Sequence, residues 1–531
     1  MSLLRAAATV SSLTLLSRIT GLARDIIIAR LFGASALTDA FWVAFRIPNL
    51  MRRLFAEGAF SQAFIPILGE VKQSSENDQA VRVFIDKVAL VLLATLTIVT
   101  LIGIIGAPVV VMIMASGMAG EDRAQAYDAA VWMTRIMFPY IICMSLVAFA
   151  SGVLNTYKRF AIPALTPVLL NLSMIAGSLL LQPYVEQPIF ALAVGVMIGG
   201  IAQLSVQWCA LWRLRLRPRL GTSASAAFAD PTVRRVIRQM VPATLGVSVA
   251  QISLLINTNI ATWLAPGSVT WLSFADRLME FPTAFIGVAL GTVLLPTLSR
   301  AHASNESGQY SDLLDLGVRL VLLLGLPAAL CMIMLADAMV ATLFQYGAFT
   351  ATDVAQTQTA VMAYSVGLIG LLLVKILAPG FYGKQDIRTP VKIAISVLIA
   401  TQLLNVALVP WLDHAGLALA IGLGACINAT ALFVGLRRRG IYQPGAGWSL
   451  FLVRQIAALA LMGACLYWLG QQVNWTDGSL SIMGRAGWLG LTLIAGGFVY
   501  LLALAAVGVR IKDFRRKKQP SVDKPPPVDV A

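Results

Sequence analysis

Long apolar runs, separated by short polar or charged segments, recur along the whole chain. Many of them approach the roughly 20 residues that an α-helix needs to cross a bilayer. The pattern therefore predicts an all-α polytopic membrane protein with about fourteen transmembrane helices. Their centres are predicted near residues 17, 52, 100, 142, 171, 200, 250, 285, 327, 367, 400, 425, 459 and 496.

The charges of the connecting segments predict an orientation. If the N-terminus is cytoplasmic, the segments assigned inside hold almost all loop Lys and Arg residues, and those assigned outside hold one cation, Arg123. Cytoplasmic loops are enriched in Lys and Arg, and a miscounted helix would invert this bias. The bias never inverts, which predicts an even number of spans with both termini in the cytoplasm.

Composition removes several classes of function. Hydrophobic residues make up 58% of the chain and charged residues 12%, against about 25% charged residues in soluble domains. The net charge of +15 lies mostly in short loops, so it indicates membrane topology and no nucleic-acid partner. The five cysteines lie in apolar runs without metal-binding spacing, and His302 and His414 fall at predicted loop positions. We expect no metal site and no cofactor.

The chain divides at its longest inside segment, residues 213–238, after which the pattern restarts. Residues 45–70 and 275–300 have equal length and share Phe, Ala, Pro and Leu at equivalent positions. Duplication of a six-helix unit gives parallel lobes related by a pseudo-two-fold axis along the membrane normal. We predict an N-terminal lobe (1–220, helices 1–6), a C-terminal lobe (221–440, helices 7–12), two extra helices (441–511, helices 13 and 14) and a basic, then Pro-rich cytoplasmic tail (512–531).

Charged residues are concentrated in the first two predicted helices, residues 15–60. Each charge at bilayer depth costs at least roughly 2.5–3.5 kcal/mol, so it must pair or line a wet cavity. Cations outnumber acids there, which indicates a site for an anion. At about 100° per residue, the charged side chains of the second helix fall within roughly 40° of one face; they are Asp39, Arg46, Arg53 and Glu57. Asp276, Arg277 and Glu280 form a second cluster in predicted helix 8, so a site between the lobes would receive arginines from both sides.

Guanidinium groups grip phosphate oxygens bidentately, so a phosphate-bearing headgroup fits these cations better than a halide or a drug cation. We predict that it binds the arginines that lack enough acidic partners, which are Arg18, Arg24, Arg52 and Arg277. Arg30 and Arg46 are interpreted as snorkelling or locally paired residues. The amides within apolar runs either bind a coupling ion or bridge helices; they are Asn257, Asn259, Asn405 and Asn428.

The chain contains the stretches SRITGLARD, TDAFWVAFRIPNLMRRLFAEGAFSQAFIPIL, ADRLMEFP, GVALGTVLLPTLS, LFQYGAFT and KILAPGFYGKQDIRTPVKIA. Together they resemble the MurJ (MviN-type) lipid II flippases of the multidrug/oligosaccharidyl-lipid/polysaccharide exporter superfamily. The resemblance covers nearly the whole chain apart from the Pro-rich tail.

This resemblance implies a transporter, not an enzyme, in the bacterial cytoplasmic (inner) membrane. It implies that lipid II, the undecaprenyl-pyrophosphate-linked disaccharide-pentapeptide, moves from the inner to the outer leaflet for peptidoglycan synthesis, with its tail in a groove at helices 13 and 14. Membrane lipids and other cell-wall synthesis proteins are the further expected partners. The expected substrate-binding residues are Arg18, Arg24, Arg52, Arg53 and Arg277, and the expected gating or ion-pair residues are Asp25, Asp39, Glu57, Asp276 and Glu280.

The mechanism expected from these residues is alternating access. The lobes rock between inward-open and outward-open states while the acids exchange arginine partners. The membrane potential or an unidentified ion supplies the driving force, and predicted helix 7 contains no Asp or Glu for a sodium ion. Two alternatives remain: a flippase for another polyprenyl-pyrophosphate-linked oligosaccharide, and a drug/cation antiporter of the same superfamily.

Overall fold

The computed structural model describes residues 3–51, 60–74, 78–219, 221, 223–303 and 307–509. Within these ranges every regular element is a helix, which confirms the predicted fold class. The first half comprises α1 (Leu3–Phe32), α2 (Ala36–Met51), α3 (Ser61–Ser74), α4 (Asp78–Ile105), α5 (Ala107–Met114), η2 (Ser116–Met118), η3 (Glu121–Arg123), α6 (Ala124–Met137), α7 (Tyr140–Thr156), α8 (Ala161–Leu180), η4 (Gln182–Tyr184) and α9 (Phe190–Arg213). The second half comprises α10 (Ala224–Ala229), α11 (Pro231–Trp263), α12 (Ser268–Ala303), α13 (Ser307–Met334), α14 (Ala336–Phe344), α15 (Ala351–Val366), α16 (Leu368–Tyr382), α17 (Arg388–Arg438), α18 (Trp448–Gly470) and α19 (Ile482–Ala506).

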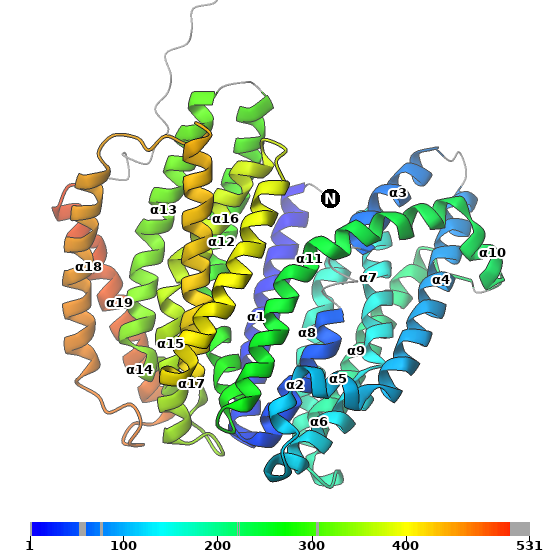
Figure 1. Cartoon of the computed structure of the whole chain (residues 1–531), viewed down its shortest axis with the longest axis horizontal. Coiled ribbons are helices and arrows are strands. Elements are labelled where there is room, and N and C mark those ends of the chain that lie inside the picture. The colour runs from blue at the N-terminus through cyan, green and yellow to red at the C-terminus, as the bar shows by residue number, and fades with distance from the viewer. Residues whose placement is uncertain are drawn as a thin grey trace, which may run out of the picture.

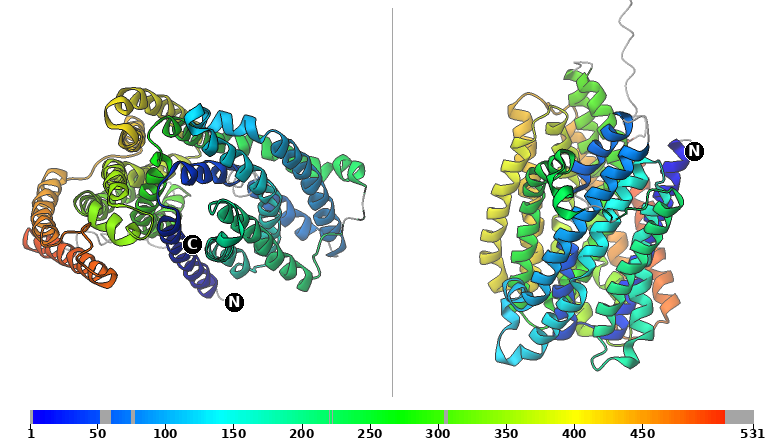
Figure 2. Two further views of the ribbon diagram at one scale, coloured as in Figure 1. Left: turned by 90° about the horizontal axis from the view of Figure 1, so that it is seen from below. Right: turned by 90° about the vertical axis from the view of Figure 1, so that its right-hand side faces the viewer.

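The helices form two groups that lie side by side (Figure 1). In the N-lobe (α1–α9), α8 packs on α1 and α9, α2 packs on α6, and α7 packs on α4 and α9. In the C-lobe (α12–α17), α12 packs on α13, α15 and α16, and α17 packs on α15 and α16. α18 and α19 pack on each other at the edge of the molecule, as the view from below also shows (Figure 2), and contact the C-lobe through α13 and α14.

α11 connects the two lobes, because it contacts α3 and α4 on one side and α12 and α17 on the other. Its N-cap residue Asp230 accepts the backbone N–H groups of Thr232 (2.9 Å) and Val233 (3.2 Å), which satisfies donors that the helix itself leaves unpaired. Lys87 of α4 donates to the same carboxylate at 2.6 Å. The start of α11 is therefore fixed to the N-lobe.

Nine helices in the described part of the chain are long and apolar enough to span a membrane. Large apolar side chains cover outward faces, including Ile102 (64% exposed) and Ile105 (78%) of α4 and Ile494 (73%) of α19. Exposed apolar faces of this extent suit a lipid environment. The predicted total of fourteen crossings stays a prediction.

α17 comprises two helices that meet at a sharp break, as the sequence predicts. This 51-residue element contains both helices predicted near residues 400 and 425, and Asp413 breaks it with φ 47° and ψ −131°. His414 follows the break, is 4% exposed, and its Nε2 lies 2.8 Å from the carbonyl oxygen of Gln356. The expectation of a loop position for His414 is wrong, because the connection is so short that the side chain returns into the helix packing.

Buried apolar residues form two clusters. One lies within the N-lobe around Phe64 and Phe149, whose ring centroids are 5.3 Å apart. The other extends through both lobes, where the Phe274 ring lies 6.2 Å from that of Trp42 and 4.7 Å from that of Phe344. This second cluster joins the lobes near the face where α1 ends, at the bottom of Figure 1.

Candidate functional site

Asp25 lies between two arginines that come from different lobes. Arg24, its neighbour on α1, donates to Oδ1 of Asp25 from Nε (2.9 Å) and Nη2 (2.6 Å). Arg277 of α12 donates to Oδ2 from Nε at 2.5 Å. Asp25 is 1% exposed and Arg24 is 5% exposed. Since a buried charge is costly unless it is paired, the Arg24–Asp25–Arg277 triad ties α1 to the C-lobe.

Asn171 of α8 holds the triad from the N-lobe side. Its Oδ1 accepts Nη1 of Arg24 at 3.1 Å, and its Nδ2 donates to the Ser17 carbonyl oxygen (3.0 Å) and the Thr20 hydroxyl (3.1 Å). Asn171 therefore positions both the guanidinium and the backbone of α1. We did not predict this residue from the sequence, although an amide within an apolar run is the same signal that singled out Asn257.

Arg277 lies at the accessible edge of the triad. Its side chain is 29% exposed and its Nη1 donates to Oε2 of Glu280, itself 45% exposed, at 2.7 Å. Asp276 is exposed on the same helix and interacts electrostatically with Arg277. The structure thus brings the predicted residues of α1 and α12 together, and their roles in binding and gating stay predictions.

Asp39 of α2 lies at the N-terminus of α12. Its Oδ2 accepts the N–H of Gly267 at 2.7 Å, and its Oδ1 accepts the N–H (2.8 Å) and the hydroxyl (2.6 Å) of Thr270. A carboxylate at this position satisfies unpaired backbone donors and interacts favourably with the helix dipole. Asp39 therefore caps a helix of the other lobe. Among the described residues its partners are two backbone N–H groups and the Thr270 hydroxyl, not the arginines that we expected.

Arg46 also crosses to the C-lobe. Its guanidinium donates to the hydroxyl groups of Thr258 on α11 and, at 3.4 Å, of Ser273 on α12. Two partners of Arg46 are hydroxyls more than 200 positions away, which a search for nearby carboxylates does not find, and the interpretation of Arg46 as snorkelling or locally paired did not include them. Asp39 and Arg46 do share one helix face, as their seven-residue spacing predicts, and that face contacts the C-lobe.

Arg18 and Lys375 extend the positive charge along α1 and α16. Arg18 is half-buried and lies within electrostatic range of Lys375, whose Nζ donates to the Thr283 carbonyl oxygen of α12 at 2.9 Å. We call the charged side chains around the triad the interlobe cluster; its described members are Arg18, Arg24, Asp25, Arg46, Asp276, Arg277, Glu280 and Lys375. Cations outnumber carboxylates in this cluster, which is the physical basis for attracting an anion.

Three of the predicted site residues, Arg52, Arg53 and Glu57, lie outside the described residues. The phosphate contact expected for Arg52 and the pair expected between Arg53 and Glu57 therefore stay predictions.

The N-lobe is also joined to the end of α11, next to the C-lobe, by polar contacts at the face where α1 ends. Arg123 Nη1 donates to the Thr262 carbonyl oxygen at 2.6 Å, and Asn259 Nδ2 donates to the Ile113 carbonyl oxygen at 2.9 Å. A Cβ atom on Gly117 would lie 2.5 Å from the backbone of Thr262. This face is therefore tightly closed.

Arg30 takes part in this closure through its backbone. Its carbonyl oxygen accepts the N–H of Ala348, in the loop after α14, at 2.9 Å. Gly347 has φ +59°, and a Cβ atom there would lie 2.3 Å from the same carbonyl oxygen. A glycine is therefore required on both conformational and steric grounds.

The amides of α11 and α17 form a bridge between these helices. Asn257 Oδ1 accepts Nδ2 of Asn405 at 2.8 Å and Nε2 of Gln402 at 3.4 Å. These bonds support the helix-bridging interpretation, and the binding of a coupling ion here stays a prediction.

The interlobe cluster can bind an anion by exchange of partners. A guanidinium carries five N–H donors, and Arg277 uses Nε and Nη1 on Asp25 and Glu280. Arg277 is partly exposed and Asp25 is sealed, so Arg277 is the accessible partner of this pair. Transfer of Arg277 from Asp25 to phosphate would release α12 from α1.

Comparison with known proteins places this geometry in a family context. The family model described as "Lipid II flippase MurJ" matches residues 28–485. The chain is 50% identical to the lipid II flippase MurJ of Burkholderia cenocepacia over 517 residues, which covers 97% of this chain and 100% of that protein.

Two solved structures share the fold. "Lipid II flippase MurJ, inward closed conformation" matches with a TM-score of 0.76 and 21% identity, over 94% of this chain and 98% of that one. An inward-facing multidrug resistance MATE family transporter of the MOP superfamily matches with a TM-score of 0.64 and 15% identity, over 82% and 98%. At these identities the likeness shows the fold alone.

Proposed function

The chain belongs to the MurJ family of lipid II flippases, and from this membership and the interlobe cluster we propose how it moves its substrate. The proposed substrate is lipid II, and the proposed step carries its pyrophosphate headgroup from the inner to the outer leaflet of the bacterial cytoplasmic membrane. The burial of Asp25 between Arg24 and Arg277 carries the proposal, because it provides a phosphate-binding group whose release separates the lobes.

The orientation in this proposal has the face where α1 begins in the cytoplasm. The segment that follows α9 and the C-terminal end of α17 are rich in arginine at this face, whereas the η3 segment at the other face begins with two acids, Glu121 and Asp122. Lys and Arg concentrate in cytoplasmic loops. Both chain termini are then cytoplasmic.

The proposed cycle starts from the contacts of this structure, with the lobes joined at the outer face. Lipid II enters from the inner leaflet with its tail in lipid. Its pyrophosphate competes first with the exposed Glu280 and then with Asp25 for Arg277. Once Arg277 holds phosphate, α12 is no longer tied to α1, and the lobes rock to the outward-open state. Release outside lets Asp25 take Arg277 again.

The membrane potential is the proposed driving force, with an unidentified ion as the alternative. An inside-negative potential expels an anion with about 2.3 kcal/mol per charge per 100 mV, which is roughly 4–5 kcal/mol for a pyrophosphate with about two charges. Proteoliposomes with a clamped potassium diffusion potential test this. Transport that is independent of the potential, at fixed ion gradients, would refute potential-driven turnover.

The test of the site uses fluorescent lipid II in proteoliposomes, with outer-leaflet arrival read by an added impermeant quencher. We expect Arg277→Gln and Arg24→Gln to lower the initial rate at least tenfold, because each removes a guanidinium. Arg82→Gln, an exposed cation on α4, is the matched control and should transport normally. Normal transport by Arg277→Gln would refute the assignment.

The nearest alternative substrate is another polyprenyl-pyrophosphate-linked oligosaccharide, because it offers the same pyrophosphate to the same arginines. Competition between lipid II and undecaprenyl pyrophosphate carrying an unrelated sugar separates the two. We expect lipid II to win by more than tenfold. Other cell-wall synthesis proteins are proposed partners that would deliver or receive lipid II. A drug/cation antiporter fits less well, because an excess of cations repels a cationic drug.

A further inference from the structure

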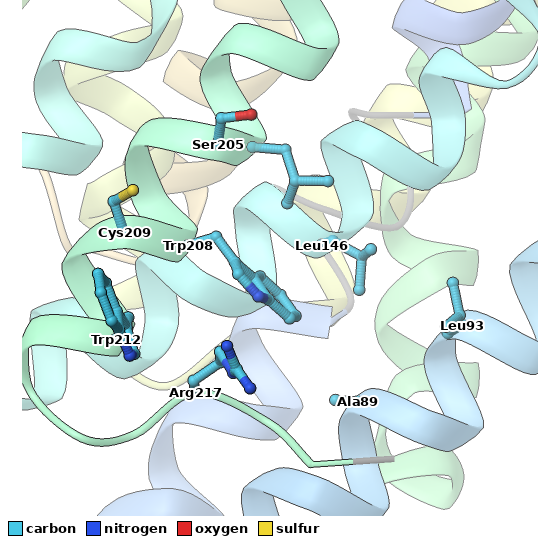
Figure 3. A pocket seen from close by; sticks show the side chains of 9 residues that line it. Ala89, Leu93, Leu146, Ser205, Trp208, Cys209, Trp212 and Arg217 are labelled. Carbon is cyan, nitrogen blue, oxygen red and sulfur yellow. The ribbon is translucent and has the colours of Figure 1, made fainter.

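A cavity of about 540 Å³ opens on the surface of the N-lobe (Figure 3). It lies between α4, α7 and α9, and no member of the interlobe cluster lines it. The lining residues that matter here are Leu93, Leu146, Leu204, Trp208, Trp212 and Arg217. Trp212 is 64% exposed and Ile201, on the same helix, is 55% exposed. The cavity therefore faces the surroundings of the N-lobe, which are lipid for a protein of this kind.

One end of the cavity carries hydrogen-bond donors. Arg217 lies in the segment after α9, beside Trp208 in Figure 3, and its side chain is exposed. Among the residues that the structure describes, neither the Arg217 guanidinium nor the Trp208 indole N–H has a hydrogen-bond or ion-pair partner. Unused donors of this kind, a cation and an indole N–H together, suit a phosphate oxygen.

The charge around this end is positive. Arg215 and Arg219 lie on the same segment as Arg217, and Arg213 is the last residue of α9. The nearby carboxylate on α4 is Asp86, whose Oδ1 already accepts the backbone N–H of Arg219 at 2.8 Å. Anionic groups are therefore attracted to this end and have little competition from protein acids.

The other end of the cavity is apolar. The length of the cavity along α9 is close to the thickness of the hydrocarbon layer of one leaflet. Leu204 lies nine residues before the end of α9, so the cavity reaches about 13 Å along the helix from its charged end. Half of the hydrocarbon core of a bilayer is about 15 Å thick. Leu93 and Leu146 complete the apolar wall. An acyl chain laid along α9 from the charged end would stay in contact with these leucines.

We propose that this cavity binds an anionic two-chain phospholipid, with its phosphate on Arg217 and Trp208 and an acyl chain along Leu93, Leu146 and Leu204. The assignment to the inner leaflet rests on the proposed orientation, whereas the binding itself does not. Anionic lipids are attracted to basic segments at the cytoplasmic surface, and indole rings favour the interface. The alternative is that Arg217 merely snorkels to water, which gives no lipid selectivity.

The test counts lipids bound to the purified full-length chain by native mass spectrometry. Phosphatidylglycerol, phosphatidylcholine and undecaprenyl phosphate are titrated separately. We expect the first phosphatidylglycerol to bind at least fivefold more tightly than phosphatidylcholine. Arg217→Gln should remove that preference, because it weakens phosphatidylglycerol binding more than phosphatidylcholine binding. Arg213→Gln, an exposed arginine that does not line the cavity, should keep the preference.

Three results would overturn the proposal. The first is an unchanged phosphatidylglycerol affinity in Arg217→Gln. The second is an equal loss in Arg213→Gln, which would indicate a diffuse basic surface. The third is a loss in Arg217→Gln that concerns undecaprenyl phosphate alone, which would indicate a carrier-lipid site. Thermal melting in the same detergent checks that each variant is folded. This experiment measures lipid binding and not transport. Its result can therefore be interpreted even if the proposed flippase cycle is wrong.

Discussion

Asp25 of α1 and Arg277 of α12 form a 2.5 Å ion pair in which the acid side chain is 2% exposed and the arginine side chain 29% exposed. The pair therefore has an accessible and an inaccessible partner. An anion can approach Arg277 while Asp25 remains covered by Arg24. The attraction between the lobes can then be replaced by attraction to a substrate without water first reaching the buried carboxylate.

We expect Asp25→Asn to destabilise the protein and to stop transport. The amide keeps the shape of the side chain but leaves Arg24 buried without its counter-ion. Removing one partner of a buried pair costs about 3–5 kcal/mol. Glu280→Gln is the control, because water reaches the half-exposed Glu280 and Arg277 keeps Asp25 as its partner, so the loss should be about 0–1 kcal/mol, as for pairs in contact with water. Thermal melting of the purified variants measures the difference. Equal melting temperatures for Asp25→Asn and wild type would show that the pair does not hold the lobes.

Asp39→Ala should loosen the face where α1 ends. The substitution leaves the N–H groups of Gly267 and Thr270 without their acceptor, and each unsatisfied buried donor costs about 1–3 kcal/mol. Spin labels at the exposed Ala119 and Thr352, one on each lobe, report the separation of the lobes at this face. We expect a longer-distance population in Asp39→Ala.

The matched control for Asp39 is Asp122→Ala, which removes an exposed aspartate of the η3 segment. Its distance distribution should match that of wild type. If Asp39→Ala also leaves the distribution unchanged, the cap is a local feature of α12 and contributes nothing to closure.

The sequence predicted the features that depend on the periodicity of apolar and charged residues along the chain. Apolar runs predicted the helices, and the spacing of Asp39 and Arg46 predicted that both face one direction, toward the C-lobe. The charges of α1 and α12 were singled out because ionised groups are rare in apolar helices. These signals are local, so they can be read without knowing which helices are neighbours.

The partners of these residues could not be predicted, because they depend on tertiary contacts. The donors that hold Asp39 are largely backbone N–H groups, which every residue but proline has, so nothing in the sequence marks Gly267. The hydroxyl partners of Arg46 are ordinary helix residues. Asn171 carried a usable signal that was overlooked, and the burial of His414 follows from the short break in α17.

Gly117→Ala should keep the lobes from closing fully. A Cβ atom at this position would lie 2.5 Å from the backbone of Thr262 on α11, and backbone cannot move aside as a flexible side chain can. We expect a slower transport rate and a longer distance between the Ala119 and Thr352 labels. Gly120→Ala is the control, because a Cβ atom there meets nothing within 4 Å. Equal transport by the two variants would mean that tight closure at this face is not needed.

Asp386 lies between α16 and α17, outside the membrane-spanning helices. Hydrogen bonds from the side chain and backbone of Thr389, together with the Arg439 guanidinium, lower the pKa of this carboxyl to about 2. Since the folded pKa lies below the unfolded value of about 3.9, the stabilisation is fully present above about pH 4 and is lost as the pH falls toward 2.

We therefore expect Asp386→Asn to lower the melting temperature at pH 7. The difference in melting temperature between this variant and wild type, here called the gap, should shrink as the pH falls from about 4 toward 2. Melting curves in detergent over this range measure the gap. Asp312→Asn, an exposed aspartate at the start of α13, serves as the control and should show no comparable gap at pH 7. A gap for Asp386→Asn that stays constant down to pH 2 would contradict the prediction, because the benefit would then not depend on the ionised carboxylate. An absent gap at pH 7 would show that water screens the Asp386–Arg439 pair, which lies at the surface, enough to cancel its contribution.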